Sequence, residues 1–538
     1  MQRPFAAPRQ PNVVPHGKTP VGVVIALCYL LISAARTLYF FWQPDDTLIG
    51  IVPDDAFYYI QLALHHASGS GWTFDGQAPA TGFHLLYAYL LSGAFQILGP
   101  IDWRSLFLAV SCLGALACAW STWRIVRLTE AVSGTWAAIV AGSLFLAPLS
   151  IDQPNLMMES WLVILVGAEV THLVFDHAQR SSLARNVILP LVLGMVGSLS
   201  RSDFGLMPAM LCLGNIACGQ SLRSTSTRSA FLATFGAALG VGLVMLHTHA
   251  IAHSWLQASA QTKLLWAREL GYSTHASLQF VRDYLAAPIK SGTLHLLAKA
   301  GLTFLVIGVG IATVLATLQR AQLVTKDPRE TPLLVSATLT LVGYITFYRF
   351  NSEALHDWYA STYAIPLALF FGMLAGKCRP VKMQSVVAGL FFSYFTLATI
   401  SALTIVKWPH QASFMEAGKR IARILNNQHR YASWNAGIIG YFSQKDLINI
   451  DGLVNDEVLP FLTQRNLPAY IQKRRIDTIV DYEVMFEQDR WLRRGGYDKR
   501  WITRCIEPGP YMDSPDSPRW VQSRLRVFSV RSDCLPTR

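Results

Sequence analysis

Apolar runs long enough to cross a lipid bilayer recur along most of the sequence, and they limit the possible folds more than any other feature. They begin at Val21 and end near Val406, and runs of roughly 17 to 24 residues suffice for a helix to cross about 30 Å of hydrocarbon. Of the 538 residues, 52% are hydrophobic and 14% are charged, whereas about a quarter are charged in soluble domains. We therefore expect an α-helical polytopic membrane protein.

Lys and Arg residues gather in short segments between the runs, which predicts that those segments are cytoplasmic. This pattern also accounts for the net charge of +12. Because the basic residues do not form one continuous stripe, as they would in a nucleic-acid-binding surface, we expect no nucleic-acid partner. The predicted spans are 21–42, 104–126, 132–150, 160–176, 186–200, 204–218, 229–250, 294–317, 332–348, 359–376 and 383–406. An N-terminal segment 1–20 in the cytoplasm then places the C-terminus outside, in the periplasm of a bacterial inner membrane.

The first outer loop, 43–103, contains no Lys or Arg but includes the apolar stretch Phe83–Leu98. At about 16 residues this stretch is short for a membrane span. Counting it as a span would also place the basic clusters outside. We therefore expect a helix that lies along or dips into the outer interface, a depth that suits Tyr87 and Tyr89.

The tail, residues 408–538, differs from the membrane domain 21–407 in its mixed and charged composition. Its apolar patterns predict short strands at 437–442, 447–452 and 476–481 and helical stretches at 412–426 and 456–474. We expect a C-terminal extracytoplasmic α/β domain. Outside the cytoplasm, Cys505 and Cys534 could form a disulfide or remain free, and their spacing does not decide between the two.

The segment most informative about chemistry is Pro53-Asp-Asp-Ala-Phe-Tyr-Tyr-Ile60 in the first outer loop. It places the adjacent carboxylates Asp54 and Asp55 at the start of an amphipathic stretch, although an Asp before a helix is also an ordinary N-cap. Glycine turns and aromatic residues follow at 69–76 and 80–84. A substrate carried by a membrane lipid would meet this loop.

Residues 53–86 resemble the first outer loop of bacterial GT-C glycosyltransferases and depart from its usual pattern at Ala80 and Leu85. Weaker likenesses follow in order at 158–159, 200–203, 437–442 and 449–455. The superfamily includes protein O-mannosyltransferases, aminoarabinose transferases and mycobacterial arabinosyltransferases. The resemblance implies a GT-C-like fold and an Asp of the first outer loop as acceptor base. Asp54 matches that position best, with Asp55 beside it.

The implied reaction is transfer of a sugar from a polyprenyl-phosphate carrier to an envelope polysaccharide, lipid or protein acceptor, by one-step inversion. A carboxylate within hydrogen-bond reach can take the proton of the attacking hydroxyl. Two alternatives remain: a secondary transporter or flippase, and a noncatalytic glycan-binding scaffold. A transporter would favour charges near the bilayer midplane, whereas the notable charges here sit at outer helix ends.

Further candidates lie at the predicted outer ends of other spans. Glu159 is a second acidic candidate at a position where the superfamily often has one, although it could also face water at a helix end. Arg201 could face the carrier phosphate or simply pair with Asp203. The remaining substrate-binding candidates are His84, Lys263, Arg349, His356 and Tyr359.

A metal ion is a further possibility. Asp54, Asp55 and Glu159 could supply the hard oxygen ligands that Mg²⁺, Mn²⁺ or Ca²⁺ prefer. The resemblance argues the other way, since enzymes that use monophosphate carriers often need no metal. No cofactor is therefore assigned from the sequence.

Overall fold

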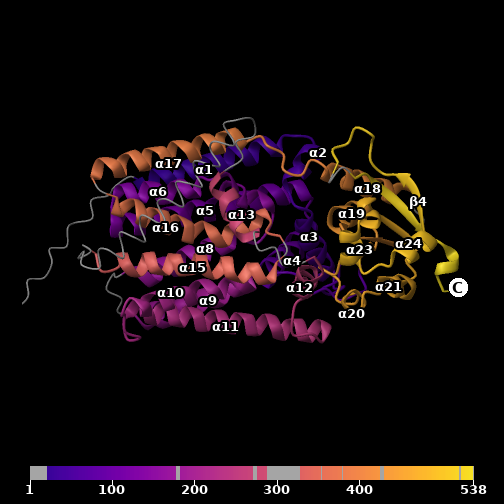
Figure 1. The fold of residues 1–538 in the computed structure, drawn as a ribbon, viewed down its shortest axis with the longest axis horizontal. Helices are drawn as coiled ribbons and strands as arrows, with labels where there is room; N and C mark the ends of the chain where they lie inside the picture. Colours follow the sequence, from indigo (N-terminus) through magenta and orange to yellow (C-terminus); the bar gives the residue numbers. More distant parts are fainter. Residues whose placement is uncertain are drawn as a thin grey trace, which may run out of the picture.

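The computed structural model describes residues 21–176, 182–270, 276–286, 327–352, 354–378, 380–424, 429–519 and 523–536. Long helices form one region of the molecule, and a smaller domain that contains a β-sheet lies at one end of it (Figure 1). The helices α3, α4 and α12 lie where the two parts meet. The predicted N-terminal segment 1–20 and the predicted span 294–317 lie outside the described residues.

The helices of the first region follow the apolar runs of the sequence. Ten of the eleven predicted spans contain a helix in the described residues. The helices are α1 (Val21–Phe41), α2 (Asp45–Leu48), α3 (Asp54–Ala67), α4 (Leu85–Leu98), α5 (Trp103–Ser133), α6 (Thr135–Phe145), α7 (Pro148–Ile151), α8 (Ser160–Phe175), α9 (Leu189–Ser200), α10 (Leu206–Ala217), α11 (Thr225–Ala252), α12 (Ala258–Leu270), α13 (Ala276–Ala286), α15 (Glu330–Asn351), α16 (Ala360–Lys377) and α17 (Val381–Ala402). Single 3₁₀ or π turns lie at Ile49–Ile51, Gln153–Leu156, Ala184–Ile188, Ser202–Gly205 and Asp357–Tyr359.

Six of these helical segments are long and apolar enough to cross a membrane, namely α1, α5, α11, α15, α16 with its preceding turn, and α17. Four shorter apolar helical segments accompany them, at 85–98, 135–145, 160–175 and 184–200. The chain is therefore a multi-pass membrane protein. The total of eleven spans remains a prediction, as does the interfacial position of α4.

Glycines allow the helices α9 and α11 to pack with their backbones close together. A Cβ on Gly194 would lie 1.9 Å from the carbonyl oxygen of Ala233, and one on Gly236 would lie 2.0 Å from that of Leu191. Small residues at helix contacts are how membrane helices approach closely, because lipid provides no hydrophobic force to press them together.

Two cations, the buried Arg36 and the partly buried Lys407, join α1 and the end of α17 to the loop before α8. Arg36 pairs with Asp152 at 2.6 Å (Nε to Oδ1) and donates to the carbonyl oxygens of Ala402 and Leu403, at 3.0 and 2.6 Å. Lys407, just after α17, pairs with Asp152 as well. The last turn of α17 is thereby satisfied by a side chain from the first membrane helix, and the start of the tail is fixed relative to the bundle.

The C-terminal domain is built on one five-stranded mixed sheet. Its strands are β1 (Tyr431–Ser433), β2 (Ile448–Asn449), β3 (Thr478–Tyr482), β4 (Ile506–Tyr511) and β5 (Leu525–Val530), in the order β2-β1-β3-β5-β4. The first three strands are parallel, whereas β5 runs antiparallel to both β3 and β4. The helices are α18 (Gln411–Ile424), α19 (Ala436–Ser443), α20 (Leu459–Thr463), α21 (Leu467–Arg474), α22 (Val484–Glu487), α23 (Asp489–Gly495) and α24 (Lys499–Cys505), followed by a 3₁₀ turn at Ser532–Cys534.

The sequence analysis was wrong about one element of this domain. The segment 437–442, predicted as a buried strand, lies within the helix α19, whereas the strands predicted near 447–452 and 476–481 are present. A short continuous apolar run does not distinguish a strand from a buried helix. The open question of the two tail cysteines is answered, since Cys505 and Cys534 form a disulfide.

Candidate active site

The adjacent acidic pair of the first outer loop lies in the first turn of α3. Pro53 is extended and precedes the helix, and Asp54 and Asp55 are its first two residues. Carboxylates in this turn interact favourably with the helix dipole. Successive helical residues point about 100° apart, so the two carboxylates have different surroundings.

Asp54 faces the C-terminal domain. Its carboxylate accepts hydrogen bonds from the backbone N–H groups of Gly437 (3.1 Å) and Ile438 (2.7 Å), in the first turn of α19. Gly437 is required at this contact, because a Cβ there would lie 2.2 Å from the Asp54 carbonyl oxygen. Burial raises the pKa of Asp54 to about 7, the Ile438 N–H acts against this, and the neighbouring Asp55 carboxylate adds to it.

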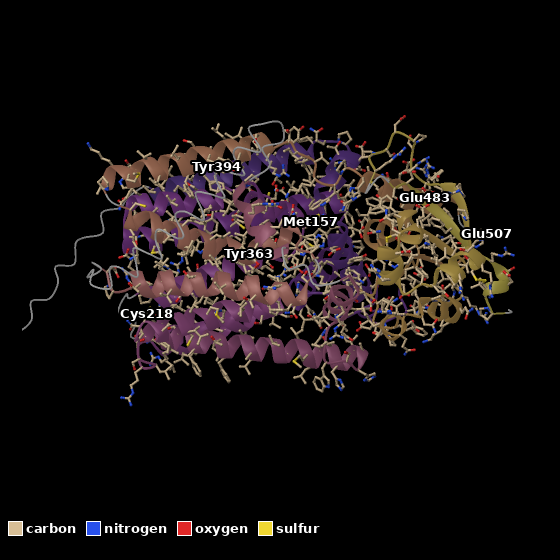
Figure 2. The ribbon with its side chains drawn as sticks, viewed as in Figure 1. Met157, Cys218, Tyr363, Tyr394, Glu483 and Glu507 are labelled. Atoms are coloured by element: carbon tan, nitrogen blue, oxygen red, sulfur yellow. A yellow bond between two sulfur atoms is a disulfide. The ribbon has the colours of Figure 1, made fainter. Side chains whose placement is uncertain are left out.

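Asp55 lines a narrow cavity where α3, the loop before α4, the start of α8 and α12 come together. Four further ionisable residues predicted from the sequence line the same cavity: His84, Glu159, Arg201 and Lys263. The other lining residues are Tyr58, Tyr59, Gly82, Phe83, Met158, Ser259, Trp358, Leu453 and Val454. In Figure 2, Met157, which precedes the lining residue Met158, lies between the helices that carry Tyr363 and Tyr394 and the domain that carries Glu483 and Glu507.

Glu159 is fully buried at the start of α8, where it is held by hydrogen bonds. The Tyr59 hydroxyl donates to its Oε2 (3.1 Å) and Arg201 Nη1 donates to its Oε1 (3.1 Å). Arg201 also pairs with Asp203 through two bonds, of 3.0 and 3.1 Å. Burial alone would lower the pKa of Arg201, but the Asp203 carboxylate keeps it well above its usual value, so the guanidinium is charged.

Lys263 and Arg201 share one aromatic ring. The Lys263 Nζ donates to the Tyr359 hydroxyl at 3.2 Å and lies 5.6 Å from the ring centroid, while the Arg201 guanidinium carbon lies 4.5 Å from that centroid. Burial would lower the pKa of Lys263, but the Tyr359 oxygen and the Asp55 carboxylate raise it, so the ammonium is charged. The cavity thus combines the carboxylates of Asp55 and Glu159 with two cations, a set in which the cations can bind a phosphate-bearing substrate.

His84 lies at the rim of the cavity, with its Nε2 3.5 Å from Glu159 Oε1. Burial lowers the pKa of His84 to about 4, the Glu159 carboxylate opposes this shift, and Arg201 reinforces it. The imidazole is therefore neutral at physiological pH. It can exchange hydrogen bonds with a substrate without adding charge.

Comparisons with known proteins give the fold a name. ArnT from Cupriavidus metallidurans, solved bound to undecaprenyl phosphate, superposes with a TM-score of 0.50 over 96% of this chain and 99% of its own, at 12% identity. The oligosaccharyltransferase AglB from Archaeoglobus fulgidus was solved with an inhibitory peptide and a dolichol-phosphate. It superposes with a TM-score of 0.50 over 96% of this chain and 75% of its own, at 12% identity. The Archaeoglobus fulgidus oligosaccharyltransferase in complex with Zn and sulfate superposes with a TM-score of 0.51 over 86% of this chain and 68% of its own, at 14% identity. The chain has the GT-C fold.

Sequence comparisons add a domain family. Residues 404–522, most of the tail, match a domain family of unknown function, DUF8728. No curated protein matches the sequence. The GT-C fold is thus recognised through the structure, and the tail through its sequence.

Four residues predicted for the site are not among those that line the cavity: Asp54 and Tyr359, whose contacts are described above, and Arg349 and His356. Arg349 is exposed on α15, where its guanidinium lies over the Phe350 ring. Tyr344 and Tyr348 are buried four residues apart on α15, so the next position, 349, faces away from the core. His356 is also exposed and stacks on Trp358, whose own ring reaches the cavity.

The three carboxylates considered as metal ligands are not gathered into one set. Asp54 binds the backbone of α19, and Glu159 pairs with Arg201. Among the residues that the structure describes, no group of three or more His, Cys, Asp or Glu is placed to hold a metal ion. The oxygen-ligand site suggested for Mg²⁺, Mn²⁺ or Ca²⁺ is therefore not formed by these residues.

The tail also contributes to the cavity. Leu453 and Val454 line the cavity, and the Leu453 carbonyl oxygen lies where a Cβ on Gly82 would be, at 1.5 Å. Beside this contact, Thr81 donates to Asp456 through its N–H (2.7 Å) and its hydroxyl (2.8 Å). No local pattern signals these contacts. Tyr59, by contrast, follows Asp55 by four residues, so helical spacing could have identified it.

Proposed function

We propose that this protein is a glycosyltransferase that moves a sugar from a polyprenyl-phosphate carrier to a hydroxyl of a cell-envelope acceptor. The observation that carries the proposal is the single cavity that combines the carboxylate of Asp55 with the charged groups of Lys263 and Arg201. The GT-C fold supports it, because the solved structures with this fold include one with undecaprenyl phosphate and one with dolichol-phosphate.

Asp55 is the proposed base. Its carboxylate accepts the proton of the acceptor hydroxyl while the hydroxyl oxygen forms a bond to the anomeric carbon of the donor sugar. The bond from that carbon to the phosphate oxygen breaks, and its electron pair remains on the phosphate. Asp54 is instead a positioning residue, since its carboxylate is held by α19.

The arrangement of the carboxylates supports one-step inversion as the proposed course. Retention would require a carboxylate nucleophile in addition to the acid–base group. Glu159, the other acidic residue lining the cavity, is held by Tyr59 and Arg201. We assign it the task of orienting Arg201.

Lys263 and Arg201 are the proposed partners of the leaving phosphate. The charge on the phosphate rises as the sugar departs, so cations fixed beforehand stabilise the transition state. Arg201 is already neutralised by Glu159 and Asp203. Lys263 donates to the Tyr359 hydroxyl, and Asp55 is the carboxylate that acts on its charge, so we assign Lys263 the main contact with the phosphate.

The proposed location is the bacterial inner membrane, with residues 408–538 as the periplasmic domain and 21–407 as the membrane domain. Ser133, Glu330 and Lys377 meet at the helix ends remote from that domain, close to the basic residues that the positive-inside rule places in the cytoplasm. The Cys505–Cys534 disulfide supports an oxidising compartment for the other end.

The test is transfer of radiolabelled sugar from defined polyprenyl-phosphate sugars to a host envelope extract by purified protein. Asp55→Asn should lower the rate about 10²- to 10⁴-fold, the contribution typical of a general base. Asp46→Asn is the matched control, because it changes an exposed acidic residue in the same loop and should transfer normally. Wild-type protein that transfers no sugar, or Asp55→Asn protein that transfers at the wild-type rate, would exclude the proposal.

A second variant tests the phosphate site. Lys263→Met keeps the length of the side chain but removes its charge, and loss of one charge-assisted contact should lower kcat/KM for the donor about 10- to 100-fold. The effect should be the same for donors that differ only in their sugar. A loss that depends on the sugar would instead place Lys263 in the sugar pocket.

A further inference from the structure

A large groove lies on the other side of α3 from the proposed active site. Two cavities, of about 690 and 250 Å³, share Lys445 and Asp446 as lining residues and so lie next to each other; together they are here called the tail groove. It begins at Trp103, at the start of α5, and continues past α18 and α19 to Arg430 and Tyr431 at β1. None of the residues proposed for catalysis lines it.

The tail groove carries an excess of positive charge. Lys419, Arg423, Lys445 and Arg430 line it, although Lys419 also lies 3.7 Å from Asp45 (Nζ to Oδ2), and Asp446 is an exposed acidic residue of the lining. The remaining charges of the lining, Asp75 and Arg474, neutralise each other at 2.7 Å. Such a groove concentrates anions.

Aromatic side chains form part of its wall. Trp103, Tyr441 and Phe442 line the larger cavity, and the Lys419 ammonium lies 5.4 Å from the centroid of the Phe442 ring. Aromatic rings provide flat apolar faces next to polar groups, as binding sites for small ligands generally do. Sugar rings have matching apolar faces, and acidic substituents on them would meet the cations.

The position of the groove suits the distal part of an acceptor. Gln61 and His65, which line it, follow Asp55 on α3 by six and ten residues, which is about 9 to 15 Å along a helix. α19 lies alongside α3, where Gly437 packs against Asp54 and Gly440 packs against Gln61. An acceptor chain of several sugars in the groove would thus lie within a few sugar lengths of the proposed base.

We propose that the tail groove binds the acceptor, and that this acceptor is an anionic glycan carrying carboxylate or phosphate groups. The inference rests on the proposed function and names its substrate class. A glycan fits better than a lipid headgroup because the groove continues over the sheet domain to β1, away from the membrane helices.

The probe is a hexamer of galacturonic acid, and its fully methyl-esterified form is the matched neutral control. Binding is measured by thermophoresis with the full-length Asp55→Asn protein, so that turnover cannot interfere. The acidic hexamer should bind at least tenfold more tightly than the ester. Its Kd should rise with salt, because exposed charges are screened.

Two double variants locate the site. Arg423→Gln with Lys445→Gln should weaken binding of the acidic hexamer about tenfold, as expected from two partly exposed charge pairs. Arg500→Gln with Arg504→Gln removes two exposed charges from α24, outside the groove, and should leave the Kd unchanged. Equal effects of the two double variants, or equal binding of acid and ester, would overturn the proposal.

A lipid occupant gives a different result. Binding of the acidic hexamer is compared at matched salt in nanodiscs of phosphatidylcholine and of phosphatidylglycerol. The Kd of the hexamer should be similar in both if the groove binds a glycan. Loss of hexamer binding only in phosphatidylglycerol would identify a lipid-headgroup site and refute the inference. Failure of sugar transfer by the wild type, with binding intact, would count against the proposed enzyme and leave the groove as a glycan-binding site. Transfer without binding would refute the groove alone.

Discussion

Docking of the tail on the start of α3 should depend on pH, and Asp54 should be the main cause. The pKa of Asp54 is about 7 when α19 covers it, against about 3.9 for an exposed Asp. The covered state therefore binds a proton more readily than the open state. Docking must become weaker as the pH rises through 7, and it is most favourable below that value.

The magnitude follows from the shift. A carboxyl with a pKa of about 7 in the docked state and about 4 in the open state changes the docking free energy by about 1.4 kcal/mol between pH 6 and pH 8, or about tenfold in the equilibrium constant. Asp456, whose pKa burial raises to about 6, adds about 0.4 kcal/mol with the same sign. Asp54→Asn should remove the first contribution and leave the second.

Hydrogen exchange at the amides of Gly437 and Ile438 measures this directly, because the Asp54 carboxylate accepts from both. After correction for the intrinsic exchange rate, protection should fall about tenfold or more from pH 6 to pH 8 in the wild type, and about twofold in Asp54→Asn. Asp46→Asn, in the same loop, should behave as the wild type. Protection that does not change with pH, or the same slope in Asp54→Asn, would refute the reasoning.

Three further predictions concern stability. Gly82→Ala should disrupt docking of the tail and abolish transfer, since its Cβ would collide with the Leu453 carbonyl oxygen; normal activity would contradict this. Arg36→Met should lower the free energy of unfolding by about 3–5 kcal/mol, because it leaves the buried Asp152 short of a partner, as measured by thermal unfolding in detergent. Replacing Cys505 by Ser opens a loop of 29 residues and should cost the tail about 3–4 kcal/mol, to be checked by urea unfolding with and without reductant.

The sequence was most informative where one physical rule governs many residues. Helices had to follow the apolar runs, because backbone groups in lipid must be satisfied within the segment, and α1, α5 and α11 lie where those runs predicted. The acidic pair was also recognisable, since its two carboxylates stand in the first turn of an amphipathic helix. What remained hidden was which of Asp54 and Asp55 faces the cavity.

That choice depends on contacts between distant segments. The first turn of α19 receives its hydrogen-bond acceptor from Asp54, 383 residues away, so no local capping pattern marked α19 as a helix. Arg349 failed as a candidate for a similar reason, because only the packing of α15 decides which of its faces is buried. The Glu159–Arg201 pair likewise required the structure, since the sequence offered Asp203 as an equally good partner.

The contact between Asp54 and α19 also sets an order of events during synthesis. α3 leaves the ribosome early, but the two N–H groups that hold Asp54 belong to residues made 383 and 384 positions later. At about 5–20 residues per second, the delay is about 20–80 seconds. Throughout that interval, the acidic pair at the start of α3 is not yet fixed, so a nascent chain cannot complete this contact before its own tail has been made and folded.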